Sequence, residues 1–529
     1  MNRFATFIGS SLRAPAALAW LLAASCALLA LWWGNVNQDE GWYLYAAQLV
    51  HEGRLPYRDF FFTQGPSLPI VYSFLYPVWA KGALLQGLLG GRVVTLCFSL
   101  LSTALAVALV RRMVAPEKRP LASLAVFALL SCNLYHVYFT TIPKTYALGG
   151  AFVLVGFLFL AVALERGAKI GGVMAFLSGL AFAFASGTRI SLVLILGTTG
   201  VYLLLSFRRW RWRFLWFGLG GVAGLFATYG LFALDPASLR GLLAAQAYHA
   251  ARGGFDPVFA IGAVSRLSRG YAALGVVLFA LLAMPRPAMR APEAPRAVLH
   301  AILLGFFAVF LLQLSAPFPY DDYQVPIMGI LAVAIVAAFA GRIASPIRAA
   351  WFVALTAGLC AFSAPQLQEW NMHAQDRFWS RKKSMSELAK MRLVSQEIEM
   401  LDPGGEMLLT QDLYLAVDAG RKVPEGLEMG PFSYFPELSA EEAAAVKVLD
   451  DSRFEKVLDS APCAIAAFSG YGFAIASPKG EVVPFERQRI LWEALRRRYE
   501  LVARETDFGQ NATTLLLMRR RDGGQEVAK

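Results

Sequence analysis

The sequence predicts a mainly α-helical membrane protein, with a bundle of about eleven transmembrane helices and a C-terminal α/β domain. Of its 529 residues, 57% are hydrophobic and only 16% are charged, whereas a soluble protein carries about a quarter charged residues. Long stretches almost without charge recur as far as about residue 365, and beyond it the charge density is that of a soluble protein. We therefore expect a membrane domain over residues 1–365 and a soluble domain over residues 366–529.

The apolar stretches have the length that a membrane span requires. A helix needs about 20 apolar residues to cross the hydrocarbon layer. The first stretch is long for a signal-peptide core and lacks a convincing cleavage site, so we expect a retained signal anchor. The predicted spans are 16–33, 88–110, 121–141, 146–164, 170–187, 190–206, 214–234, 270–284, 297–315, 323–341 and 349–365.

The loops between these spans alternate in charge. One set is basic, and the other is mostly mixed or acidic, except for the basic loop 235–269 and the single cations Lys144 and Arg189. By the positive-inside rule the basic set is cytoplasmic. An odd number of spans then places the soluble domain outside, in the periplasm or extracellular space. The Ala, Leu and Arg bias is typical of a high-GC bacterium, so we expect the bacterial inner membrane.

Composition also argues against two other classes of protein. The formal net charge is +12, but much of the Lys and Arg lies in short loops or in the soluble domain. We therefore expect no nucleic-acid partner. Four of the five cysteines lie inside apolar stretches, and neither the cysteines nor the histidines show a metal-ligand spacing. This pattern predicts neither a disulfide framework nor a zinc site.

Residues 37–66, directly after the first span, carry the strongest candidates for chemistry. They begin Asn-Gln-Asp-Glu-Gly-Trp-Tyr and continue through Gly-Arg-Leu-Pro-Tyr-Arg-Asp-Phe-Phe. Helical spacing and Gly53 as a stop predict a short helix on the outer membrane surface, with Asp39 at its N-terminus and Glu40 in its first turn. Either Asp39 is only an N-cap, or it is a carboxylate held at the water–lipid boundary that can act as a general base.

An Asp-Glu pair just after the first transmembrane helix resembles the signature of the GT-C membrane glycosyltransferases. These include the protein O-mannosyltransferases and the aminoarabinose transferases of lipid A. The Gly-x-x-Pro-Tyr-x-Asp-Phe-Phe pattern of residues 53–61 is similar to one common in bacterial members. The resemblance implies a GT-C-like helix bundle that transfers a sugar from a polyprenyl phosphate to a glycan, lipid or protein acceptor, with inversion. It also implies that Asp39 is the base and that Glu40 supports it.

Cations on the same side of the membrane are candidates to hold the donor phosphate. Arg189 lies between two apolar stretches, where a charge costs about 2.5–3.5 kcal/mol on insertion scales. It is therefore either a partner for a lipid phosphate or a residue in an exposed turn that reaches water. Lys144 is a similar candidate. Arg58 is a third, although it and Arg54 have the simpler alternative of pairing with a nearby acid such as Asp59.

The remaining candidates are expected to contact the acceptor or to form a lid. Loop 235–269 is either a lid over the substrate or only a loop. The acids before the tenth span are helix N-caps, acceptor contacts or a metal site with Asp39. No cofactor is assigned beyond the polyprenyl-phosphate sugar as donor substrate, and a divalent metal stays open. The candidates are Tyr43, Tyr57, Asp59, His249, Arg252, Tyr320, Asp321 and Asp322.

Short apolar runs at 464–468 and 514–518 alternate with helical patterns near 439–458 and 484–498, which predicts a small α/β domain. The alternative function is a transporter or flippase of a lipid-linked sugar. Such a protein should show acids or broken helices near the membrane midplane, and the sequence shows neither plainly. In a third interpretation the chain is a non-enzymatic scaffold, and the acidic pair only caps a helix.

Overall fold

The computed structural model describes residues 13–251, 253–283, 292–317, 319–340, 351, 354–360 and 385–521. The chain forms two compact units. The first contains the described residues of Met1–Leu31, Thr95–Tyr229 and Gly254–Lys382, and the second those of Trp32–Val94, Gly230–Gly253 and Lys383–Lys529. The second unit therefore joins C-terminal residues with two segments from the N-terminal half of the chain. The division at residue 365 stays a prediction.

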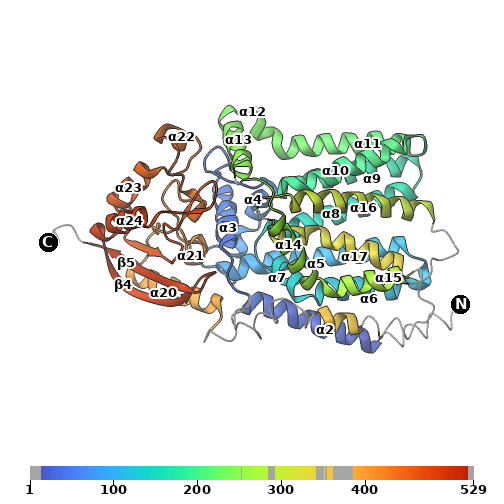
Figure 1. The fold of residues 1–529 in the computed structure, drawn as a ribbon, viewed down its shortest axis with the longest axis horizontal. Helices are drawn as coiled ribbons and strands as arrows, with labels where there is room; N and C mark the ends of the chain where they lie inside the picture. The colour runs from blue at the N-terminus through green and yellow to red at the C-terminus, as the bar shows by residue number, and fades with distance from the viewer. Residues whose placement is uncertain are drawn as a thin grey trace. The chain divides into compact units, whose positions relative to one another are not determined.

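The first unit is a bundle of apolar helices, and α8, α9 and α11 pack side by side in it (Figure 1). Among the described residues, seven helices are long and apolar enough to cross a membrane, or up to nine if two bent pairs each form one span. The chain is therefore a multi-pass membrane protein. The helices are α2 (Arg13–Leu28), α5 (Leu88–Met113, in this unit from Thr95), α6 (Arg119–Ser131), α7 (Leu134–Thr141), α8 (Thr145–Glu165), α9 (Ala168–Thr188), α10 (Val193–Leu205), α11 (Phe207–Leu225), α14 (Pro257–Gly270), α15 (Ala272–Ala283), α16 (Glu293–Leu314) and α17 (Val325–Ala340).

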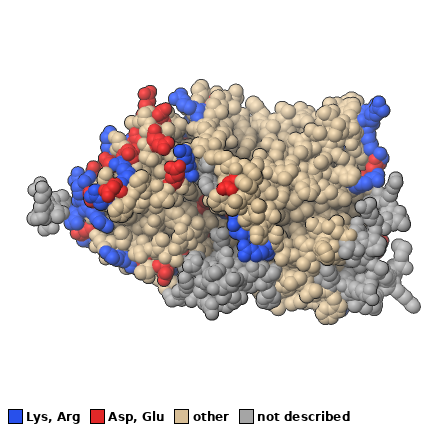
Figure 2. Space-filling model, viewed as in Figure 1, with Lys and Arg blue, Asp and Glu red and all other residues tan. Residues whose placement is uncertain are grey.

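Small residues let these helices approach closely. A Cβ atom on Gly179 of α9 would lie 2.1 Å from the carbonyl oxygen of Phe217, and one on Gly220 of α11 would lie 1.9 Å from that of Phe176. Glycines at such contacts are typical of helix packing in membranes. On the face seen in Figure 2, few charged side chains lie over α8, α9 and α16, and charges gather instead over the C-terminal elements.

The predicted span 121–141 is bent rather than straight, and the predicted loop 235–269 contains the helix α14, which forms a second bent pair with the start of the predicted span 270–284. The chain bends by 67° between Ser131 and Leu134 and by 86° between Gly270 and Ala272. The breaks contact each other, because the side-chain amide of Asn133 donates to the carbonyl oxygen of Gly270 at 3.0 Å. Such contacts satisfy backbone groups that a broken helix leaves open. The last predicted span, 349–365, lies mostly outside the described residues.

The second unit combines helices with a small antiparallel sheet of order β1-β5-β4, beside a two-stranded sheet β2-β3. The predicted strands near 464–468 and 514–518 and the predicted helices near 439–458 and 484–498 are confirmed. The elements are α3 (Gln38–His51), α4 (Ser67–Ser73), α12 (Leu231–Leu234), α13 (Pro236–Ala250), α20 (Glu387–Leu401), α21 (Leu413–Ala419), α22 (Ala440–Ala445), α23 (Asp451–Ser460), α24 (Phe485–Arg498), β1 (Ile465–Phe468), β2 (Ile475–Ala476), β3 (Glu481–Val482), β4 (Tyr499–Phe508) and β5 (Thr513–Arg520).

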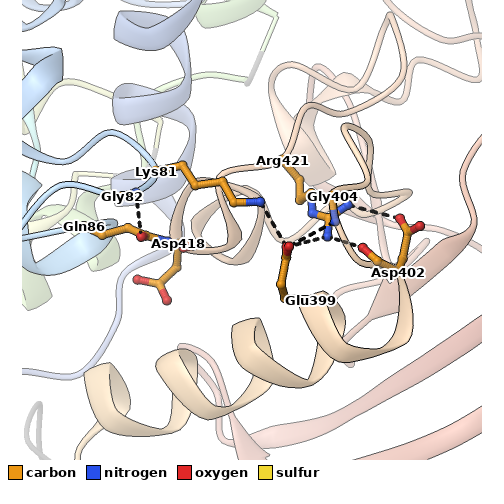
Figure 3. Close-up of polar contacts among 8 residues, drawn as sticks. All are labelled: Lys81, Gly82, Gln86, Glu399, Asp402, Gly404, Asp418 and Arg421. Atoms are coloured by element: carbon orange, nitrogen blue, oxygen red, sulfur yellow. Dashed lines mark hydrogen bonds and ion pairs between the residues drawn. The ribbon is translucent and has the colours of Figure 1, made fainter.

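A buried arginine fastens α20 to its surroundings in the second unit (Figure 3). The guanidinium of Arg421 is fully buried and donates to Glu399 at 2.7 Å and to Asp402 at 3.1 Å. The ammonium of Lys81 donates to the same Glu399 carboxylate at 3.0 Å. The backbone N–H of Gly404 and the side chain of Lys81 lower the pKa of Glu399 to about 2. These contacts join the segment around Lys81 to the C-terminal residues.

Candidate functional site

Helix α3 begins at Gln38, and its N-cap is Asn37. The Asn37 side chain accepts a hydrogen bond from the backbone N–H of Asp39 at 3.1 Å. In return, the carboxylate of Glu40 accepts from the backbone N–H of Asn37 at 2.8 Å, which completes a capping box. The N-cap is therefore Asn37 and not Asp39, which lies in the first turn of the helix.

Asp39 is the one residue in the fully described run 34–49 that is not buried. Its carboxylate accepts a hydrogen bond from the indole N–H of Trp42 at 3.2 Å. The Trp42 ring stacks on Tyr43, with the ring centroids 3.8 Å apart. The carboxylate is thus held in one direction by a buried aromatic pair while it keeps access to the surface. Tyr43 is buried within this pair.

Glu40 forms a bidentate ion pair with Arg92, and both side chains are completely buried. The guanidinium donates to the two carboxylate oxygens at 2.7 and 2.8 Å. It also donates to the carbonyl oxygens of Gly34 at 2.9 Å and Asn35 at 3.2 Å. Arg92 therefore fixes both the first turn of α3 and the chain that leads into it. No local pattern in the sequence points to Arg92, which lies 52 residues beyond its partner.

The expectation of a helix on the membrane surface needs a correction. A surface helix keeps one polar face exposed, but residues 40–49 of α3 are all buried. Helices α4 and α21 pack against α3. The helix is therefore a core element of the second unit, and its ending at Glu52 and the positive φ of 87° at Gly53 confirm the predicted stop.

Arg58 and Asp59 form a local ion pair at 2.9 Å, and the Arg58 side chain is 45% exposed. Burial alone would raise the pKa of Asp59, but hydrogen bonds from Arg58 and from the backbone N–H of Leu55 outweigh it and lower this pKa. Arg54, by contrast, pairs with Glu428 at 3.0 Å. The predicted local pairing thus holds for Arg58, whereas Arg54 pairs with a C-terminal acid that lies far away in the sequence.

Helix α13 lies over the 57–64 segment of the motif. The His249 ring nitrogen Nε2 lies 2.8 Å from the carbonyl oxygen of Thr63 and 3.4 Å from the side-chain nitrogen of Gln64. The hydroxyl of Tyr57 donates to the carbonyl oxygen of Gln64. The structure therefore brings the predicted residues Tyr57 and His249 close together, because both contact Gln64. His249 lies on the helix α13, in a part of the chain that the sequence analysis expected to be a loop. Arg252 lies outside the described residues.

The predicted cation Lys144 and the predicted acid Asp322 meet within the first unit. Their side chains pair at 2.9 Å, and both residues are buried. The hydroxyl of Tyr146 donates to the same carboxylate oxygen at 2.9 Å. The guanidinium of Arg189 lies 4.0 Å above the ring centroid of Tyr323. The result is a polar group with two cations, the buried Lys144 at the start of α8 and the partly exposed Arg189 at the end of α9.

The acids before the tenth span are not the caps of the short helix that they open. The N-cap of the 3₁₀ helix Asp321–Gln324 is Tyr320, which is an exposed residue. The carboxylate of Asp322 contacts Lys144 and Tyr146 instead. The side chain of Asp321 lies outside the described residues. Among the residues that the structure describes, no group of three or more His, Cys, Asp or Glu side chains could hold a metal ion.

Comparison with known proteins identifies the class to which this fold belongs. No protein-family model matches the sequence, and no curated protein matches it. Among solved structures, the chain shares the fold of a GT-C membrane glycosyltransferase.

This glycosyltransferase is ArnT from Cupriavidus metallidurans, and the chain is similar to it in structure. The two match with a TM-score of 0.62 and 14% identity, over 95% of this chain and 97% of ArnT. ArnT is described both in the apo state and bound to undecaprenyl phosphate. An oligosaccharyltransferase from Archaeoglobus fulgidus matches with a TM-score of 0.48 and 11% identity, over 87% of this chain and 69% of that chain. The predicted GT-C-like bundle is confirmed.

Proposed function

We propose that this chain is a glycosyltransferase that moves a hexosyl or pentosyl group from a polyprenyl-phosphate donor to an acceptor hydroxyl at the outer face of the bacterial inner membrane. The observation that carries the proposal is the partly exposed Asp39 carboxylate at the start of the otherwise buried helix α3. The GT-C fold and the undecaprenyl phosphate bound to ArnT support the choice of donor. The acceptor is a glycan, a lipid or a protein.

In the proposed reaction, Asp39 takes the proton from the acceptor hydroxyl. The acceptor oxygen attacks the anomeric carbon while the bond from that carbon to the phosphate oxygen breaks. The lipid phosphate leaves with the bonding electrons, and the anomeric centre is inverted. A glycosidase needs a second carboxylic acid to protonate a poor leaving group, but a phosphate departs without one. A single base therefore suffices.

The other predicted residues have supporting roles in this proposal. Glu40, held by Arg92, fixes the turn that carries Asp39. Lys144 and Arg189 hold the donor phosphate, and because Asp322 neutralises Lys144 in this structure, a phosphate would compete with that acid. Arg58 is a third cation for the donor. Of the residues that the sequence analysis named as acceptor contacts or a lid, Asp322 pairs with Lys144, and the others keep that assignment: Tyr43, Tyr57, Asp59, His249, Arg252, Tyr320 and Asp321.

A transfer assay with labelled polyprenyl-phosphate sugars tests the proposal. Membranes carry the wild type, Asp39→Asn, or Asp459→Asn as a matched control at an exposed carboxylate of the second unit. We expect transfer with the wild type and the control, and a loss of roughly 100-fold or more in Asp39→Asn, the size of a lost general base. Equal transfer by all three would refute the base assignment. Movement of the donor across the membrane without any transfer would favour the transporter.

A further inference from the structure

The turn between β4 and β5 contacts the start of α3 within the second unit. The side-chain oxygen of Gln510 accepts a hydrogen bond from the backbone N–H of Gln38 at 2.7 Å. The carbonyl oxygen of Gln510 accepts one from the side-chain amide of Asn35 at 2.9 Å. The first backbone N–H groups of a helix have no partner inside the helix, so Gln510 supplies an acceptor that α3 itself lacks. The residues of this turn are 509–512.

Tyr414 lies between this turn and α3 and contacts both. A Cβ atom on Gly41 of α3 would lie 2.2 Å from the backbone nitrogen of Tyr414. A Cβ atom on Gly509, where φ is +72°, would lie 2.4 Å from the Tyr414 hydroxyl. The same residue therefore touches the helix through its backbone and the turn through its side chain. Neither contact leaves room for any residue other than glycine.

A buried carboxylate fixes Tyr414 in its turn. The hydroxyl of Tyr414 donates to Asp412 at 2.7 Å, and the hydroxyl and backbone N–H of Ser469 donate to the same carboxylate at 2.8 and 2.9 Å. Burial raises the pKa of Asp412. Buried polar networks in which every member has a partner are rigid. The path from the C-terminal core to the first turn of α3 thus runs through the buried residues Asp412, Tyr414 and Ser469 and ends at the partly buried Gln510.

We propose that Gln510 is a positioning residue for Asp39, which makes the β4–β5 turn part of the catalytic scaffold. This inference rests on the proposed function, in which Asp39 is the base. Gln510 holds the residues on both sides of the N-cap Asn37, and Asp39 follows one residue later. A base displaced by about 1 Å can lose about 100-fold in rate. The C-terminal residues therefore set the direction of the carboxylate and do more than cover the site.

The test compares four variants of the full chain in the transfer assay. Gln510→Ala and Gln510→Lys remove the side-chain oxygen that accepts from Gln38, whereas Gln510→Glu keeps such an oxygen. Asn511→Ala is the control at the next residue of the turn, whose side chain donates to Tyr471 and not to α3. We expect the first two to lower kcat by roughly 10-fold to 100-fold with the donor KM unchanged. Gln510→Glu should restore kcat, because a carboxylate accepts the same bond at a helix N-terminus. Asn511→Ala should behave as the wild type.

Wild-type kcat in Gln510→Ala, or an equal loss in Asn511→Ala, would overturn the inference. If Gln510→Ala unfolds, the comparison of Gln510→Glu with Gln510→Lys decides, with both normalised to folded protein by thermal unfolding. Equal kcat in that pair would also refute it. The Asp39→Asn variant separates the two proposals. If it keeps wild-type transfer, the base assignment fails, whereas a loss there with no loss in Gln510→Ala refutes only the positioning role.

Discussion

The two neighbouring acids of the motif have different environments. Glu40 is completely buried and engaged by Arg92, whereas Asp39 is partly exposed and accepts a hydrogen bond from the indole N–H of Trp42. An ionised carboxylate in the interior needs a partner of opposite charge and further hydrogen bonds. Arg92 supplies both. The ion pair of Glu40 and Arg92 therefore gives Glu40 a structural role beside the proposed base, without any part in the proton transfer.

Removing Arg92 should destabilise the chain strongly. Arg92→Met leaves the Glu40 carboxylate buried without its counter-ion, and breaking a buried pair in this way costs about 3–5 kcal/mol. The double variant Glu40→Gln, Arg92→Met removes both charges and should recover much of that loss. Thermal or denaturant unfolding in detergent measures the difference. If the single and double variants unfold alike, the pair does not carry the stability assigned to it.

The sequence identifies some of these residues but not others. Asp39 and Glu40 are visible because the pair stands directly after the first span and ahead of a recognisable motif. Arg92 and Gln510 act through contacts that span 52 and 472 residues of sequence. Such contacts leave no local pattern, because the hydrogen bonds depend only on how the chain folds back. The pairing of Arg54 with Glu428 was missed for the same reason.

Among the elements, α3 was predicted with nearly the right ends but with the wrong surroundings. Asn37, Glu40 and Gly53 are local signals for the start and stop of a helix, and they hold in the structure. Whether a helix lies on a surface or in a core depends on the elements that pack on it. The contact between the bends near Asn133 and Gly270 was likewise not predicted, since it joins segments that lie 137 residues apart.

Gly41→Ala should separate α3 from α21. The added methyl group would lie 2.2 Å from the backbone nitrogen of Tyr414 and 2.7 Å from the backbone carbon of Leu413, and backbone atoms cannot move away as a flexible side chain can. We expect a destabilisation of about 1–3 kcal/mol from overpacking and a loss of transfer activity.

Gly218→Ala is the matched control for this change. Gly218 also lies inside a helix, α11, but no atom lies within 4 Å of the position that its Cβ would take. This variant should be neutral or slightly more stable, because alanine favours a helix over glycine by roughly 1 kcal/mol. Equal effects of the two substitutions would show that the close approach of α3 and α21 is not a constraint.

In the molecule as a whole, polarity along the sequence separates membrane spans from soluble segments but does not reveal which segments fold together. The composition changes near residue 365. The second compact unit nevertheless takes in Trp32–Val94 and Gly230–Gly253 as well as the C-terminal residues. The composition of a segment indicates whether that segment is soluble, whereas the compact units are defined by contacts between residues that can lie far apart in the sequence. The proposed base therefore belongs to the same unit as the C-terminal sheet.

The stability of the chain should depend on pH through Asp418. Its carboxylate accepts hydrogen bonds from Ser395 at 3.0 Å and from the backbone N–H of Leu88 at 3.3 Å. Burial nevertheless raises its pKa from 3.8 to about 6. The folded chain therefore holds this proton more tightly than the unfolded chain does. The resulting stabilisation is fully present below pH 3.8 and is lost as the pH rises to about 6.

Asp418→Asn removes this titration and isolates its contribution. The variant should gain about 3 kcal/mol relative to the wild type as the pH rises from about 4 to about 7, since each pKa unit is worth about 1.4 kcal/mol. Above that range the difference should stay constant. Thermal unfolding of both proteins in detergent across this range measures it, with Asp459→Asn as the exposed control. A difference between Asp418→Asn and the wild type that does not change with pH would show that Asp418 is ionised in the folded chain throughout, and that its hydrogen bonds outweigh the burial of its charge.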